Sequence, residues 1–245
     1  MDFPEPLLAG VLLRRYKRFL ADVRLDNGEE VTAHCTNTGS LRTCAEPGWR
    51  VAISRAHNPK RKLPFTWELV HNGQLWIGIN THLANKLAEE AIRKGWIPEL
   101  ADWPILQRER AYGKNSRIDI LLEDGDQRCY VEVKNVTLLG DDGCICFPDA
   151  VTERGRKHLA ELSDMVREGH RAAMLYVIQR GDGTSFRAAH EIDPAYAAAV
   201  TEAMAAGVEI LAYRADVSLQ GIELRHRVQL HPDLVSRPTP QPPGS

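Results

Sequence analysis

Residues 116–138 read SRIDILLEDGDQRCYVEVKNVTL, and this stretch decides how the second half of the chain is interpreted. Two apolar runs flank the polar turn Asp124-Gly125-Asp126, which predicts an antiparallel hairpin. Side chains alternate across a strand, so Glu132 and Lys134 share one face of the second strand. If the polar faces of the two strands coincide, Asp119 on the first strand lies beside Glu132.

The two carboxylates of this hairpin favour a metal site. The apolar neighbours place the strands in a core, where charged groups need partners, and adjacent carboxylates repel unless a cation neutralises them. Mg²⁺ or Mn²⁺ fits an Asp–Glu pair, whereas no matched His or Cys set points to zinc. The alternative is a solvated surface carrying ordinary charges, because the spacing D-x12-E-x-K often arises by chance.

A third carboxylate, on a neighbouring helix, would favour a metal site over ordinary surface charges. Apolar residues recur at helical spacing after Asn80, and Gly95 is the expected stop. Glu90 lies on this helix and could reach the same metal. Glu89 competes with it, because successive helical residues diverge by about 100° and only one of the two can point inward.

Composition fits a folded chain of two compact domains. The 245 residues are 43% hydrophobic and 26% charged, which is typical of soluble globular proteins. No run approaches the ~20 apolar residues of a membrane helix, and no secretory signal is present, so we expect a cytoplasmic protein. The five cysteines form no CxxC pair, which favours reduced thiols.

Residues 1–80 are expected to form a small OB-like barrel. Five short apolar or alternating runs lie there, with Asp26-Asn27-Gly28 as a hairpin signal between two of them. The predicted strands are Leu8–Leu13, Phe19–Leu25, Glu30–Cys35, Trp49–Ser54 and Leu75–Ile79. The same eighty residues hold 11 Lys and Arg against 8 Asp and Glu, although the whole chain has a net charge of −2.

Residues 81–232 alternate between helical and extended patterns, which predicts an α/β (α+β) domain. After the first helix we expect three strands at Ile105–Tyr112, Ser116–Leu122 and Arg128–Val136, and then helix, strand, helix and strand up to Tyr213. Residues 233–245 are polar and proline-rich, so we expect a disordered tail.

The helix carboxylate, the D…E-x-K hairpin and a following basic helix together resemble the PD-(D/E)XK nuclease superfamily. Longer strings are similar to the sugar fermentation stimulation protein A family, SfsA. These strings include RYKRFLADV (15–23), HCTNTGS (34–40), NPKRKLPFTWELV (58–70), YVEVKNVTL (130–138) and FPDAVTERGRKHLAEL (147–162). They belong to a similarity that covers most of residues 3–230.

The resemblance implies an OB-like domain followed by a PD-(D/E)XK restriction-endonuclease-like mixed sheet with flanking helices. It implies that Asp119, Glu132 and Glu90 bind the metal and that Lys134 is the catalytic lysine of the motif. His158 is either a proton shuttle or structural. The family is known as DNA-binding, so DNA is the expected partner, with single- or double-stranded substrate undecided. Formation of a homodimer also stays open.

Basic and aromatic side chains provide the expected DNA contacts. The predicted phosphate contacts are Arg15, Lys17, Arg18, Lys60, Arg61, Lys62, Arg117, Arg154 and Lys157. Tyr16, Phe65 and Trp67 could stack on bases, although tryptophans in a small barrel are more often core.

Three functions are compatible with these features. The first is a divalent-metal-dependent phosphodiesterase, that is a nuclease, acting on DNA. The alternative is a non-catalytic DNA-binding regulator of sugar metabolism genes, in which the same cluster persists without turnover. A carbohydrate-related enzyme has only the family name behind it.

Overall fold

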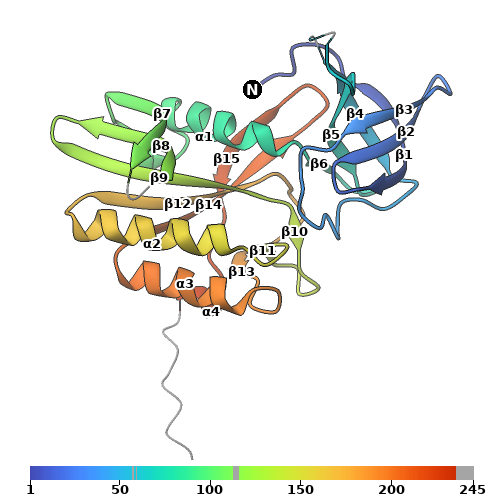
Figure 1. The fold of residues 1–245 in the computed structure, drawn as a ribbon. Helices are drawn as coiled ribbons and strands as arrows, with labels where there is room; N and C mark the ends of the chain where they lie inside the picture. The colour runs from blue at the N-terminus through green and yellow to red at the C-terminus, as the bar shows by residue number, and fades with distance from the viewer. Residues whose placement is uncertain (57, 59, 113–115, 236–245) are drawn as a thin grey trace, which may run out of the picture.

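The computed structural model of the chain describes residues 1–56, 58, 60–112 and 116–235, which fold into a β-barrel and a larger α/β body (Figure 1). The predicted order of an OB-like barrel followed by a mixed sheet with flanking helices is confirmed. Among the described residues, no helix is both long enough and apolar enough to cross a membrane.

The barrel is built from short strands that pair mainly with their neighbours in the chain. Its strands are β1 (Leu8–Tyr16), β2 (Leu20–Leu25), β3 (Glu30–His34), β4 (Arg50–Arg55), β5 (Phe65–His71) and β6 (Trp76–Gly78). They run in the order β3-β2-β1-β4-β5-β6, and a parallel pairing of β3 with β5 closes the first five strands. Gly28, with φ of 88°, forms the predicted turn between β2 and β3.

Strand β5 differs from the prediction, which left Phe65–His71 out of the barrel. Every residue from Phe65 to Val70 is buried, so the strand lacks the alternation that identifies a half-exposed strand. Trp67 is fully buried and donates its indole N–H to the carbonyl of Leu69 at 2.9 Å. Phe65 and Trp67 therefore belong to the barrel interior and are unavailable for stacking on bases.

The second body is a six-stranded mixed sheet in the order β15-β14-β12-β9-β8-β7. Its strands are β7 (Ile105–Tyr112), β8 (Ser116–Asp124), β9 (Gln127–Val136), β12 (Arg171–Ile178), β14 (Glu209–Val217) and β15 (Ile222–Arg227). β12 runs parallel to both β9 and β14, and the other pairs are antiparallel. The sequence patterns did not predict β15.

Helices cover both faces of this sheet (Figure 1). α1 (Ala84–Arg93) packs on one face, and α2 (Glu153–Arg167) and α3 (Pro194–Ala205) pack on the other. Two turns of 3₁₀ helix flank α1, at η1 (Thr81–Leu83) and η2 (Pro98–Leu100). A small sheet, β10 (Leu138–Leu139), β11 (Ile145–Phe147) and β13 (Phe186–Ala188), adjoins α3.

One buried aspartate organises the starts of both helices on the second face. Thr152 caps α2 by accepting from the backbone N–H of Gly155, and Asp193 caps α3 by accepting from that of Tyr196. Asp193 also accepts from the backbone N–H of Thr152 at 2.8 Å. The first turn of α2, which carries predicted site residues, is thereby fixed against α3.

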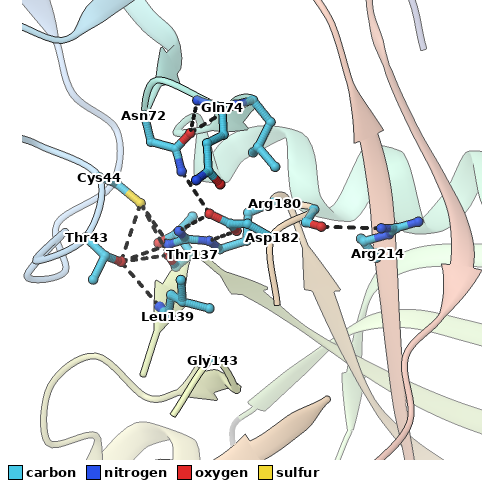
Figure 2. Close-up of polar contacts among 12 residues, drawn as sticks. Thr43, Cys44, Asn72, Gln74, Thr137, Leu139, Gly143, Arg180, Asp182 and Arg214 are labelled. Atoms are coloured by element: carbon cyan, nitrogen blue, oxygen red, sulfur yellow. Dashed lines mark hydrogen bonds and ion pairs between the residues drawn. The ribbon is translucent and has the colours of Figure 1, made fainter. Parts of the chain in front are cut away.

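A buried arginine joins the barrel to the second body (Figure 2). Arg180, 1% exposed, donates to both carboxylate oxygens of Asp182 at 2.6 and 2.7 Å. It also donates to the hydroxyl of Thr43 in the barrel at 2.8 Å and to the carbonyl of Thr137 at 2.6 Å. Asn72 of the barrel donates to Asp182 as well, so the two bodies share one hydrogen-bond network.

The chain segment predicted as a tail begins with a short helix. α4 (Pro232–Val235) includes residues 233–235, and Leu234 packs into the core with 6% exposure. The rest of the predicted tail, 236–245, lies outside the described residues.

Candidate functional site

Asp119 lies where the pairing of β8 with both of its neighbours is interrupted. The register with β9 runs as far as Ile120 opposite Val131, and the register with β7 omits the position of Asp119. The Asp119 carboxylate accepts instead from the backbone N–H of Val133 at 2.8 Å and from the side-chain amide of Asn85 on α1 at 2.7 Å. Its two oxygens are therefore held by β9 and by a helix.

Glu132 and Lys134 meet as predicted from their shared face, and His158 of α2 joins them. Lys134 donates to Oε1 of Glu132 at 2.7 Å, and Nδ1 of His158 contacts the same oxygen. Arg154 donates to Nε2 of His158 at 3.3 Å, and Nζ of Lys134 lies 3.1 Å from Nδ1 of the same ring, so the carboxylate, the ammonium and the imidazole contact one another. Glu132 is 3% exposed and the side chain of Lys134 14%.

The surroundings shift the pKa values of Asp119 and Glu132 in opposite directions. Burial raises the pKa of Asp119 above its ordinary value, and the nearby charge of Glu132 raises it further. Burial would also raise the pKa of Glu132, but the hydrogen bond with His158 and the charge of Lys134 bring it below its ordinary value. Glu132 is thus held as a carboxylate beside an aspartate that takes up a proton more readily.

One oxygen of this cluster has no protein partner. Oε2 of Glu132 is buried and lacks a hydrogen bond to any described residue. No three His, Cys, Asp or Glu side chains in the described parts of the chain group closely enough to hold a metal by themselves. The carboxylates of this cluster are those of Asp119 and Glu132, and carboxylate oxygens are ligands that Mg²⁺ accepts together with several waters.

Glu90, predicted as the helix carboxylate of the site, lies elsewhere. It pairs with the amino group of Met1 at 2.7 Å and with Lys94 at 2.8 Å. Glu89, the competing candidate, pairs with Arg93 and Arg108. Asn85 is the α1 side chain that contacts Asp119, and five positions separate it from Glu90, which is about 140° around a helix.

Arg15, predicted to contact DNA, is used within the barrel. Its guanidinium donates to the carbonyls of Arg18, Asn37, Gly39 and Ser40 at 2.8–3.1 Å. These bonds hold the loop 37–40 against the end of β1, and they occupy the donors that a phosphate would need.

The other predicted phosphate contacts are exposed. Lys17 and Arg18 form the turn between β1 and β2, both with positive φ, and present their side chains to solvent. Lys60, Arg61, Lys62 and Arg117 are also exposed, and Arg61 donates to Thr66. On α2, Arg154 bonds His158, and Lys157 lies 3.6 Å from Glu161. Their role in binding DNA stays a prediction.

His158 and Asn85 both contact the cluster, and the sequence indicated only the first of them. His158 lies on a basic helix, which made it a candidate, although a structural role was the commoner interpretation. Asn85 carried none, since an asparagine near the start of a helix is usually interpreted as a capping residue. Its contact depends on how α1 is rotated over β8.

Comparisons with known proteins place the whole described fold among relatives. Two family models match, the SfsA N-terminal OB domain over residues 13–79 and the sugar fermentation stimulation protein RE domain over residues 82–221. A sugar fermentation stimulation protein homolog of Geobacter sulfurreducens is 53% identical, covering 93% of this chain and 97% of its own. Another, from Thioalkalivibrio sulfidiphilus, is 56% identical, covering 91% and 95%.

The fold also matches a solved structure. The structure of Pyrococcus furiosus SfsA in complex with Ca²⁺ superposes with a TM-score of 0.85 at 30% sequence identity. The match covers 94% of this chain and 98% of that chain, so both the barrel and the mixed sheet are included.

Proposed function

The chain belongs to the sugar fermentation stimulation protein family, and from that premise we propose that it is a DNA-binding protein with a divalent-metal-dependent phosphodiesterase site. The site consists of Asp119, Glu132 and Lys134. The observation that carries the proposal is the buried Oε2 of Glu132, an acceptor without a partner among the described residues, near the half-buried carboxylate of Asp119. Such an arrangement is costly unless a cation completes it.

The residues present fit Mg²⁺ or Mn²⁺. Asp119 and Glu132 would hold the ion, and Asn85 with the Val133 amide would keep Asp119 in place. The Ca²⁺ in the related Pyrococcus furiosus structure supports the choice of an oxygen-binding ion. When bound, such an ion polarises a phosphate and lowers the pKa of a water ligand.

Lys134 and His158 supply the remaining chemistry. The ammonium of Lys134 has three donors, and it contacts Glu132 and His158, which leaves a third donor for a phosphate oxygen. That placement stabilises the negative charge that develops on the phosphate in the transition state. His158, held by Arg154, keeps Glu132 ionised and positioned.

Metal binding should be visible as thermal stabilisation of the folded chain. Saturating Mn²⁺, at about 100 times its Kd, is expected to add roughly 2.7 kcal/mol to the free energy of unfolding. The stabilisation should fade as the pH falls through the raised pKa of Asp119, because the protonated acid no longer binds the ion. Differential scanning fluorimetry across a pH series measures it.

The control for this shift is a site variant that keeps the fold. Asp119→Asn should melt normally without metal and show no Mn²⁺ shift, while exposed Asp126→Asn should keep the full shift. Equal shifts in wild type and Asp119→Asn would place the ion elsewhere.

A non-catalytic regulator of sugar metabolism genes is the second candidate, and one observation favours it. Lys134 and His158 both bond Oε1 of Glu132, so part of the charge in the cluster is already neutralised by protein groups. Incubation with single- and double-stranded DNA, with and without Mn²⁺, separates the two functions. Cleavage by wild type that is lost in Lys134→Ala supports the nuclease.

Both candidates require DNA binding through the exposed basic residues, and salt dependence tests it. With about six phosphate contacts, raising salt from 50 to 200 mM should weaken binding about 10³-fold. The double variant Lys17→Ala/Arg18→Ala should reduce the slope of log affinity against log salt by about 2. Arg24→Ala, which removes an exposed arginine paired with Glu30, serves as the control. A slope near zero, measured by fluorescence anisotropy, would exclude both candidates.

A further inference from the structure

A cavity of about 600 Å³ lies where the barrel meets the start of α1, apart from the Asp119 cluster. Strands β3, β4 and β5 form one wall, and residues 1–7 with 82–86 form the others. Asp119, Glu132 and Lys134 do not line it. We propose that this cavity binds a guanine nucleotide, with Glu68 accepting from the base and the cationic rim holding the phosphate.

The floor of the cavity is an acceptor. Glu68 is 6% exposed, and no cation among the described residues lies within ion-pair distance of it. Its two oxygens accept from the hydroxyl of Ser54 at 2.6 Å and from the amide of Asn80 at 2.8 Å. A carboxylate has about four acceptor positions, so Glu68, which lines the cavity, can accept two further hydrogen bonds.

This carboxylate is costly to the fold without a ligand. Burial raises the pKa of Glu68, and the hydrogen bonds of Ser54 and Asn80 only partly offset that rise. A buried, unpaired carboxylate that lines a cavity is a candidate binding group, because a ligand donor would complete its hydrogen bonds. The Asp119 cluster makes no use of it.

The rim of the cavity is cationic on the side of the barrel and of α1. Arg55, Arg61, His82 and Lys86 line it and are exposed. His34 also lines the cavity, and burial together with the charges of Arg61 and His82 lowers its pKa. Asp2 and Glu5 line the wall formed by the N-terminal segment. A ligand with donors at one end and a phosphate at the other matches an acceptor floor beneath this rim.

Among the common bases, guanine fits such a floor best. Its N1–H and its N2 amino group are adjacent donors on one edge, and together they form two parallel bonds to one carboxylate. Adenine and cytosine place a ring acceptor beside their amino group, which a carboxylate repels, and thymine flanks its single N–H with two carbonyls. Glu68 is therefore expected to discriminate among bases as well as to bind one.

The same chemistry has two sources, a free guanosine nucleotide or an unpaired guanine in a single strand. Calorimetric titration of the full chain without divalent ions tests the first, using GMP, IMP, AMP and CMP. GMP should bind about 5- to 150-fold tighter than AMP or CMP, the range for one bidentate base contact. IMP, which lacks the N2 amino group, should lie between. Titration with a 15-residue oligothymidylate, with and without one central guanine, tests the second source.

Two variants in the cavity and one control variant test the proposed contacts. Glu68→Gln should remove the preference for GMP, whereas Glu30→Gln, at an exposed glutamate of the same barrel, should keep it. Lys86→Ala, an exposed rim change that cannot disturb the core, should weaken all four nucleotides while leaving their order unchanged.

A preference for guanine, either as free GMP or within the oligonucleotide, supports the proposal and shows which of the two ligands the cavity binds. Equal affinities for GMP and AMP together with no effect of the central guanine overturn it, and so does an unchanged preference in folded Glu68→Gln. Lys134→Ala should retain the preference, so a failure of the nuclease proposal leaves this one standing.

Discussion

Lys134→Ala is expected to slow metal-dependent DNA cleavage by about 10² to 10³-fold, the usual cost of losing one donor aimed at transition-state charge. The ammonium lies 2.7 Å from Glu132 and is mostly buried, so water cannot replace it in the same position. Single-turnover cleavage of labelled DNA with Mn²⁺ measures the rate of the chemical step.

The matched control is Lys94→Ala, which removes an exposed lysine directly after α1 that pairs with Glu90 and has no contact with the cluster. It should cleave at the wild-type rate. The DNA affinity of Lys134→Ala should change little, which separates loss of chemistry from loss of binding. If Lys134→Ala and wild type cleave equally, Lys134 has no catalytic role, and if both are inert the regulator is the better account.

Local sequence patterns predicted most of the second body. Strand β7 was predicted residue for residue, and β8 and β9 within two residues, because apolar residues mark these segments and a polar turn separates the last two. The pairing of Glu132 with Lys134 follows from the same two-residue period. β5 was missed because a strand buried on both faces has no alternation, and basic residues just before it suggested a loop.

The helix contribution to the site was predicted less well, for a geometric reason. A strand residue has only two possible directions, whereas a helix residue can point anywhere around a circle, and its direction depends on where the helix begins. Asn85 and Glu90 lie on one helix, yet the first contacts Asp119 and the second pairs with Met1. Only the packing of α1 over the sheet decides between them.

Long-range contacts explain the remaining differences. Arg15 belongs to a basic string that suggested phosphate binding, but three of its four carbonyl partners come from a loop more than twenty residues away. Glu68 was not predicted as a site residue, because its burial depends on closure of the barrel between β3 and β5. No local pattern encodes such partners.

Arg180→Ala is expected to lower the free energy of unfolding by about 3 to 5 kcal/mol, the range for breaking a buried ion pair by removing one partner. Arg180 is 1% exposed, and its loss leaves the largely buried Asp182 without its cation and removes the 2.6 Å hydrogen bond to the carbonyl of Thr137. Because Thr43 belongs to the barrel, the same change weakens the junction between the two bodies (Figure 2). Urea denaturation measures the loss.

The double variant Arg180→Met/Asp182→Leu tests the cause of that loss. If an uncompensated charge dominates, removing both charges should recover a substantial part of the stability, since paired polar groups replaced by apolar ones of similar size can be nearly neutral. Arg167→Ala breaks an exposed pair with Asp164 and should leave stability almost unchanged. A loss in Arg180→Ala no larger than in Arg167→Ala would mean that Arg180 does not hold the bodies together. A double variant as unstable as Arg180→Ala would assign the loss to the missing hydrogen bonds to Thr43 and Thr137 instead of to the unpaired carboxylate.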